Sequence, residues 1–199
     1  MFRVRTFGQS AIEAGAFRLT PVSARAFALV LYLAAERGRR VPRAVVLSMI
    51  FGDQAEPNAS HSLRQLLYKL RQSGVKLESK GDEVALTADP IELDFADLLA
   101  AERLNGDQLE LIKGGFLPDF APTLTEGYAE WLDAFRARTT LELRRALVRD
   151  LARARSVGDW RTCEQAARAC LALDPLNEEA TLGLAEALAA AGSKAQAVE

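Results

Sequence analysis

One helical segment of this chain, Ser60 to Ser73, carries side chains whose types and spacing suit a defined chemistry. At 100° per residue, four leucines fall on one face, at Leu63, Leu66, Leu67 and Leu70. The opposite face offers a guanidinium and two amides that can pair with base edges, and hydroxyl and ammonium groups that suit phosphates. These polar side chains are His61, Arg64, Gln65, Tyr68 and Gln72, with Lys69 and Arg71 toward the edges.

An ordinary surface helix with solvated charges would show the same pattern, so the neighbouring elements decide between the two interpretations. A short helix precedes the segment, and a hairpin that turns at Gly81 follows it. Helix, loop, amphipathic helix and hairpin in this order predict a winged helix, in which the second helix suits a major groove and the hairpin reaches the backbone or minor groove. Lys80 is the candidate contact of the hairpin. The expected ranges are helix Arg43–Phe51, loop Gly52–Pro57, and strands Val75–Glu78 and Val84–Thr87.

The residues before these elements predict a small antiparallel sheet and one further helix. Alternating apolar residues in Phe2–Phe7, then Ala11–Glu13 and Phe17–Leu19 around a Gly turn, are typical of strands. Ala24–Arg37 has helical periodicity, and Ser23 is the expected N-cap. The first 90 residues are therefore expected to form an α+β domain.

The net charge of −2 conceals an uneven distribution of charge along the 199 residues. Residues 1–87 hold thirteen Lys or Arg against seven Asp or Glu, a net of +6, and the remainder holds a net of −8. A basic domain joined to an acidic one fits nucleic acid at one end and protein contact at the other. The sequence has no apolar run of about 18 residues and no signal peptide, so we expect a cytoplasmic protein without membrane contact.

Residues 91–199 are expected to form an all-α domain. Gly158-Asp159-Trp160 and Gly192-Ser193-Lys194 lie 34 residues apart, which is the tetratricopeptide period. Such repeats need about three units for stability, and only one and a half are visible, so we expect a domain truncated at its C-terminus and a longer parent protein. The helices are expected at Asp94–Asn105, Gly106–Lys113, Glu126–Val157, Trp160–Leu173 and Asn177–Ala191.

Catalysis is not indicated by the residues present. The one histidine, His61, lies within the amphipathic helix, and the chain has no HExxH, CxxC or phosphate-binding glycine loop. We therefore predict no enzyme activity, no metal site and no cofactor. Cys163 and Cys170 are interpreted as buried apolar residues, Trp131 and Trp160 as packing residues, and the arginines at 144, 145, 149 and 153 as a solvated or salt-bridged helix face.

Five features of the sequence form one pattern: Leu19-Thr20-Pro21 before a helix, the Ile50–Asp53 segment, the Leu63–Arg71 helix, the hairpin and the acidic helical region. This pattern resembles the antibiotic-regulatory-protein (SARP) class of bacterial transcriptional activators. The resemblance implies an OmpR-like winged helix-turn-helix fused to a tetratricopeptide-like (TPR) bacterial transcriptional activator domain. It also implies double-stranded DNA as ligand, transcription regulation through side-by-side copies on promoter repeats, and contact with RNA polymerase. By position, the recognition contacts fall to Arg64, Gln65, Tyr68 and Lys69, with Arg71 near the backbone.

The hairpin departs from that family's pattern. The stretch Lys80–Leu86 lacks the usual aromatic residue and one basic residue, and it has two acids, Asp82 and Glu83, at its tip. Repulsion between these acids and phosphate should weaken the hairpin's contact with DNA. An alternative hypothesis follows, in which the winged helix no longer binds DNA and the protein is a protein–protein interaction module.

Overall fold

The computed structural model of the chain describes residues 1–52, 56–87 and 90–192. It is an α+β protein whose contacts divide it into two units. The first unit is Met1–Asp94 with Leu117–Phe135, and the second is Phe95–Phe116 with Arg136–Glu199. Part of the expected loop, Asp53–Ala55, and the repeat residues Ser193 and Lys194 lie outside the described residues. No helix among the described residues is both long and apolar enough to cross a membrane.

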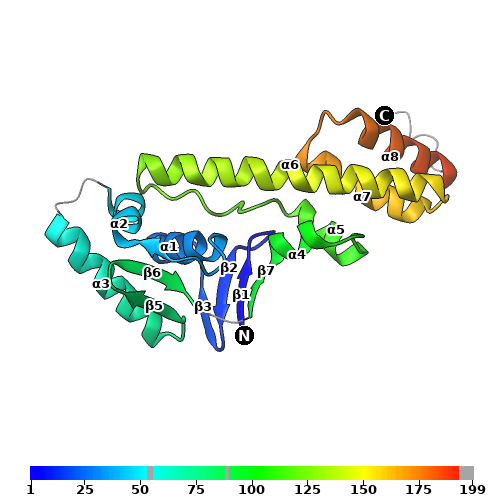
Figure 1. Ribbon diagram of the computed structural model, residues 1–199. Helices are drawn as coiled ribbons and strands as arrows, with labels where there is room; N and C mark the ends of the chain where they lie inside the picture. Colours follow the sequence, from blue (N-terminus) through cyan, green and yellow to red (C-terminus); the bar gives the residue numbers. More distant parts are fainter. Residues whose placement is uncertain (53–55, 88–89, 193–199) are drawn as a thin grey trace. The chain divides into compact units, whose positions relative to one another are not determined.

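A four-stranded sheet begins the first unit (Figure 1). Its order is β3-β2-β1-β7, formed by β1 (Phe2–Arg5), β2 (Ala11–Ala14), β3 (Phe17–Leu19) and β7 (Ile91–Leu93). The two pairings between β1, β2 and β3 are antiparallel, as predicted, but β7 pairs with β1 in parallel. The expectation of a purely antiparallel sheet is therefore wrong at this edge.

Asp94 explains the parallel pairing. Its Oδ2 accepts hydrogen bonds from the backbone N–H groups of Thr6 at 2.6 Å and Phe7 at 3.1 Å, and its Oδ1 accepts one from Thr6 Oγ1 at 2.5 Å. One carboxylate thus holds the end of β7 beside the end of β1. An ion pair of 2.7 Å between Arg3 and Glu92 adds a second cross-strand contact.

Three helices follow in the first unit: α1 (Ala24–Ala35), α2 (Arg43–Phe51) and α3 (Glu56–Gln72). Every residue of α1 from Phe27 to Ala34 is buried, so this helix forms the centre of the core. Ser23 occupies the N-cap position as predicted, but its side chain makes no capping hydrogen bond. The third helix begins at Glu56, within the expected loop Gly52–Pro57.

The predicted hairpin is formed by β5 (Leu77–Lys80) and β6 (Glu83–Leu86). A short strand, β4 (Val41–Pro42), pairs with β6, which gives a second sheet in the order β4-β6-β5. Lys80 pairs with Glu83 in register, so only Gly81 and Asp82 form the turn, and Gly81 has the positive φ of 59° that such a turn requires. The turn is therefore shorter than the predicted Ser79–Glu83.

The segment Leu117–Phe135 groups with the first unit, so the contacts do not follow a single boundary near residue 90. Thr125 Oγ1 donates to the carbonyl of Met49 at 2.7 Å, and Tyr128 Oη donates to the carbonyl of Ala28 at 3.3 Å. The rings of Phe27 and Phe120 lie 4.7 Å apart. These contacts bring the segment back onto α1 and α2.

The second unit is helical. Its helices are α4 (Asp94–Ala100), α5 (Gly106–Lys113), the later part of α6 (Glu126–Ser156), α7 (Trp160–Leu173) and α8 (Glu178–Ala190). The expected helix over Asp94–Asn105 ends at Ala100 because Asn105 caps α5, where it forms a capping box with Gln108. The backbone N–H of Leu104 also donates to the buried carboxylate of Asp150 at 2.8 Å.

The helices α7 and α8 form a closely packed hairpin. Asp159 caps α7 by accepting a bond from the N–H of Thr162, and Asn177 caps α8. Hydrogen bonds from the Thr162 side chain and from its backbone N–H lower the pKa of the Asp159 carboxyl. Cys163 and Cys170 are free and buried, as predicted, and burial raises the pKa of Cys170 to about 11.

Trp131 stacks on Phe135 at 5.3 Å in the first unit, in agreement with its expected packing role.

Gly183 permits close packing of α8 on α6, and its replacement tests this contact. A Cβ at Gly183 would lie 2.7 Å from Leu151 Cδ1 and within 3.3 Å of two further atoms of that buried leucine. We expect G183A to lower the free energy of unfolding by about 1 kcal/mol, because overpacking outweighs the gain in helix propensity. Urea unfolding followed by circular dichroism measures the change.

The matched control is G106A in the same unit. There the added methyl would meet the Gln165 side chain at an ordinary 3.6 Å, so stability should be unchanged or slightly higher. Equal effects of the two substitutions would contradict close packing at Gly183.

Candidate nucleic-acid interface

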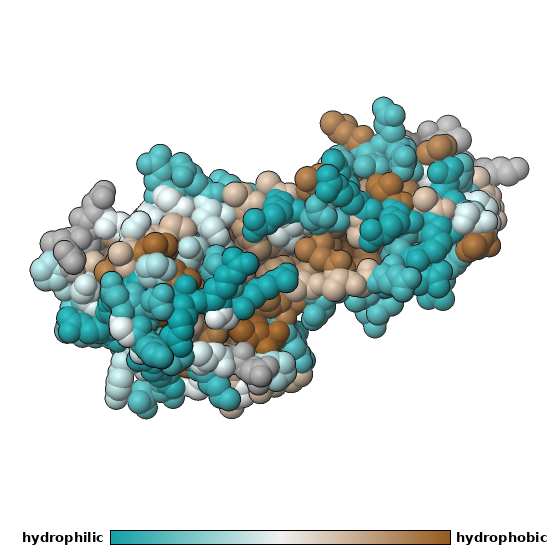
Figure 2. Space-filling view, in the orientation of Figure 1, coloured by the Kyte–Doolittle hydropathy of each residue, from teal (hydrophilic) through white to brown (hydrophobic). Residues whose placement is uncertain are grey.

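The helix α3 separates its apolar and polar faces as the sequence predicts. Leu63, Leu67 and Leu70 are at most 3% exposed, whereas Leu66 is only partly buried. Figure 2 shows mainly hydrophilic side chains over α3 and the hairpin on the face in view. Every predicted site residue of the helix is exposed, namely His61, Arg64, Gln65, Tyr68, Lys69, Arg71 and Gln72.

Bonds within the helix orient part of this polar face. Gln65 Nε2 lies 2.8 Å from His61 Nε2, and Arg64 Nε donates to the carbonyl of Ser60 at 3.2 Å. The remaining donors of the Arg64 guanidinium point to no acceptor among the described residues. Tyr68 is 63% exposed, an unusual position for an aromatic ring and one that leaves it open to a ligand.

Arg71 joins α3 to the hairpin. Its Nε donates to the carbonyl of Leu77 at 2.9 Å, and its Nη2 donates to Ser79 Oγ at 2.7 Å. The sequence predicts Arg71 only as a contact near a phosphate backbone, and the structure adds this positioning role. These two hydrogen bonds connect the outer part of α3 to the hairpin.

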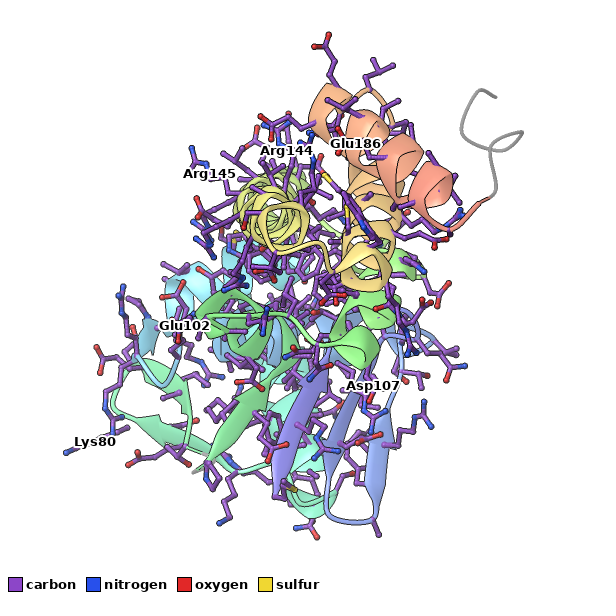
Figure 3. The ribbon with its side chains drawn as sticks, turned by 90° about the vertical axis from the view of Figure 1, so that its right-hand side faces the viewer. Lys80, Glu102, Asp107, Arg144, Arg145 and Glu186 are labelled. Atoms are coloured by element: carbon purple, nitrogen blue, oxygen red, sulfur yellow. The ribbon has the colours of Figure 1, made fainter. Side chains whose placement is uncertain are left out.

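The tip of the hairpin carries charges of both signs. Lys80 lies at the end of β5, and Figure 3 shows its side chain pointing away from the ribbon. Asp82 and Glu83 follow it and are exposed, so the tip is acidic overall. The carbonyl of Asp82 accepts a bond of 2.7 Å from the N–H of Arg43, which fixes the tip beside the start of α2.

Ion pairing around α3 differs from that of the helices in the second unit. In the second unit, Arg144, Arg145 and Arg153 pair with Asp174, Glu142 and Asp150, which agrees with the salt-bridged face expected there. Around α3, by contrast, Arg64, Lys69 and Arg71 form no ion pair with any described residue. Unpaired positive charge therefore gathers at α3.

Three further cations belong to this surface and were missed by reasoning from the sequence. They are Arg18 on β3, Arg25 at the start of α1, and Arg43 at the start of α2, whose Nη2 donates to the carbonyl of Ser60 at 3.4 Å. The excess of basic residues in 1–87 was a signal for them, but it could not assign positions.

No protein-family model matches the chain, and a search of curated proteins finds no match. Among the described residues, no group of three or more His, Cys, Asp and Glu side chains is arranged to hold a metal ion. The function is therefore inferred from the surface formed by α3, the hairpin and the cations beside them. This surface offers hydrogen-bond donors, amides and unpaired cations on a convex helix, which are features that suit an extended polyanion.

The coupling between helix and hairpin is testable without any ligand. We expect R71A to speed amide hydrogen exchange in β5 and β6 by at least about tenfold, because the variant lacks two hydrogen bonds from a charged group. R71K should restore the rate only in part, since an ammonium cannot reproduce the guanidinium fork. NMR-detected exchange gives the rates.

R64A is the matched control, because Arg64 bonds only within its own helix. Its hairpin amides should exchange at the wild-type rate. Wild-type exchange in R71A would show that Arg71 does not hold the hairpin.

Proposed function

We propose that this protein is a sequence-specific DNA-binding regulator of transcription, with α1–α3 and the hairpin acting as a winged helix-turn-helix. The observation that carries the proposal is the outer face of α3. This helix buries three leucines and presents unpaired donors beside a hairpin to which Arg71 bonds it. An α-helix of about 10–12 Å diameter fits the major groove of B-DNA, which is about 12 Å wide.

Each exposed side chain of α3 has a role in this proposal. Arg64 can donate two parallel bonds to the O6 and N7 atoms of guanine, and Gln65 can pair with adenine. Tyr68 can contact a thymine methyl group or a phosphate, and Lys69 supplies salt-sensitive attraction to the backbone. His61 and Gln72 lie one turn to either side of this group and extend the contact along the groove.

The hairpin would contribute less than the helix. Lys80 can reach a phosphate, but Asp82 and Glu83 repel one. The affinity would then depend mainly on α3 and on the cations beside it, and the hairpin would limit how the helix can be oriented.

The helical unit is proposed as the protein-contacting part. Tetratricopeptide-like packing of α6, α7 and α8 is supported by the 34-residue spacing, the caps at Asp159 and Asn177, and the close approach of Gly183 on α8 to Leu151 on α6. Counted over Phe95–Phe116 and Arg136–Glu199, this unit holds twelve Lys or Arg against thirteen Asp or Glu, a nearly balanced charge that suits contact with a neighbouring protomer or RNA polymerase better than contact with DNA. With the resemblance of the sequence to the antibiotic-regulatory-protein class, this favours a transcriptional activator.

The acidic hairpin tip favours one second candidate function. A winged helix whose hairpin repels phosphate can serve as a protein-docking module instead. In that case the polar face of α3 would bind an acidic protein surface, and duplex DNA would bind weakly and without sequence preference.

The double variant R64A/K69A separates the two functions. With a duplex that the wild-type protein selects from a random-sequence library, we expect the affinity to fall at least about tenfold. The plot of log affinity against log salt should become shallower by about one unit for each phosphate that the variant no longer neutralises. Fluorescence anisotropy over a range of salt concentrations measures both quantities.

R145A/R168A is the control of equal charge change, because both arginines are exposed and paired with carboxylates in the second unit. It should bind like the wild type. Wild-type affinity in R64A/K69A would reject α3 as the recognition helix and favour the protein-docking module.

A further inference from the structure

A groove runs along one flank of α3, between β3 and the start of α1. Its volume is about 490 Å³, and the lining includes Arg18, Ser23, Arg25, Leu66, Lys69 and Ser73. All of these residues belong to the first unit. Leu66, Lys69 and Ser73 lie on one flank of the helix, whereas Arg71 is turned by about 200° from Lys69 and bonds to the hairpin. The groove and the hairpin therefore flank α3 on opposite sides.

Three cations from three different elements meet at this groove. Arg18 is held by a hydrogen bond of 3.1 Å from its Nη2 to Gln9 Oε1, and the guanidinium carbon of Arg25 lies 5.8 Å from the centre of the Phe51 ring. Lys69 reaches the groove from α3. None of the three forms an ion pair with a described residue, although arginines elsewhere in the chain, such as Arg3 and Arg155, have carboxylate partners.

We propose that this groove binds the sugar–phosphate backbone of one DNA strand, on the side of the major groove that lies away from the hairpin. The proposal rests on the proposed function. Strands of phosphates border the major groove on both sides, so a helix inserted there has one strand along each flank. The hairpin covers one flank of α3, and the groove lies along the other.

Charge complementarity favours a polyanion over a single small anion as the occupant. The three cations stand on separate elements along an open groove, and unpaired like charges repel one another until an anion neutralises them. The acidic hairpin tip weakens the contact with phosphates on the other flank of α3. Contacts with the groove would therefore set the orientation of α3 on the duplex. Contacts with phosphates position a protein without reading the sequence.

The double variant R18Q/R25Q tests the proposal against R37Q/R39Q. Both variants lose two positive charges from exposed arginines without ion pairs, but Arg37 and Arg39 lie in the turn between α1 and β4. With the duplex selected by the wild-type protein, R18Q/R25Q should make the salt slope shallower by about two units. Its loss of affinity between 50 and 200 mM salt should be about tenfold smaller than that of the wild type. R37Q/R39Q should keep the wild-type slope.

A second measurement locates the contact on the DNA. Neutral methylphosphonate groups are placed one at a time along each strand, and at the phosphates that face the groove they should lower the affinity of the wild-type protein for the duplex. At those positions they should not lower the affinity of R18Q/R25Q further, because the partner charges are already absent. The variant R18K/R25K keeps the charges and should keep the wild-type slope, and it also shows whether loss of folding explains the result.

The outcomes distinguish this inference from the proposed function. A wild-type slope in folded R18Q/R25Q, or an equal loss of slope in R37Q/R39Q, would overturn the groove contact and leave DNA binding by α3 intact. Failure of the wild-type protein to bind any selected duplex would overturn both.

Discussion

Burial of one leucine stripe decides how the candidate interface is presented. Leu63, Leu67 and Leu70 are at most 3% exposed, and fully burying each leucine is worth about 1.5–3 kcal/mol. Turning α3 by one residue, or 100°, would expose this stripe and drive charged groups toward the core. The orientation of Arg64, Gln65 and Tyr68 therefore follows from core packing, and the polar face needs no other support to point outward.

The cations on and beside α3 are distinguished by their lack of carboxylate partners in the described part of the chain. The chain carries a net charge of −2, and its arginines differ in whether a carboxylate lies beside them. Those of α6 and α7 are largely neutralised by nearby carboxylates, whereas the cations on and beside α3 have no such partners among the described residues. Arg71 also lacks a carboxylate partner within the described ranges, but its guanidinium donates hydrogen bonds to the hairpin. A surface prepared in this way favours an external anion, despite the two acids at the hairpin tip.

Local patterns predicted much of this fold, and long-range contacts account for the differences. The period of the leucines predicted the exposed face of α3, and Gly81 predicted the hairpin. The strand β7 is three residues long, and its parallel pairing depends on Asp94 binding Thr6 across 88 residues, which no local period reveals. The return of Leu117–Phe135 to the first unit depends on rings such as Phe120 finding α1. Arg18 and Arg25 meet at the groove only through tertiary folding.

Recovery of bound genomic DNA tests the central claim most directly. The protein would be mixed with fragmented DNA from its own source at about 150 mM salt, where non-specific binding is weak, and the bound fragments sequenced. The account predicts enrichment of a few promoter fragments that share a spaced repeat. No enrichment with folded protein would contradict sequence-specific binding by α3 and favour the protein-interaction module.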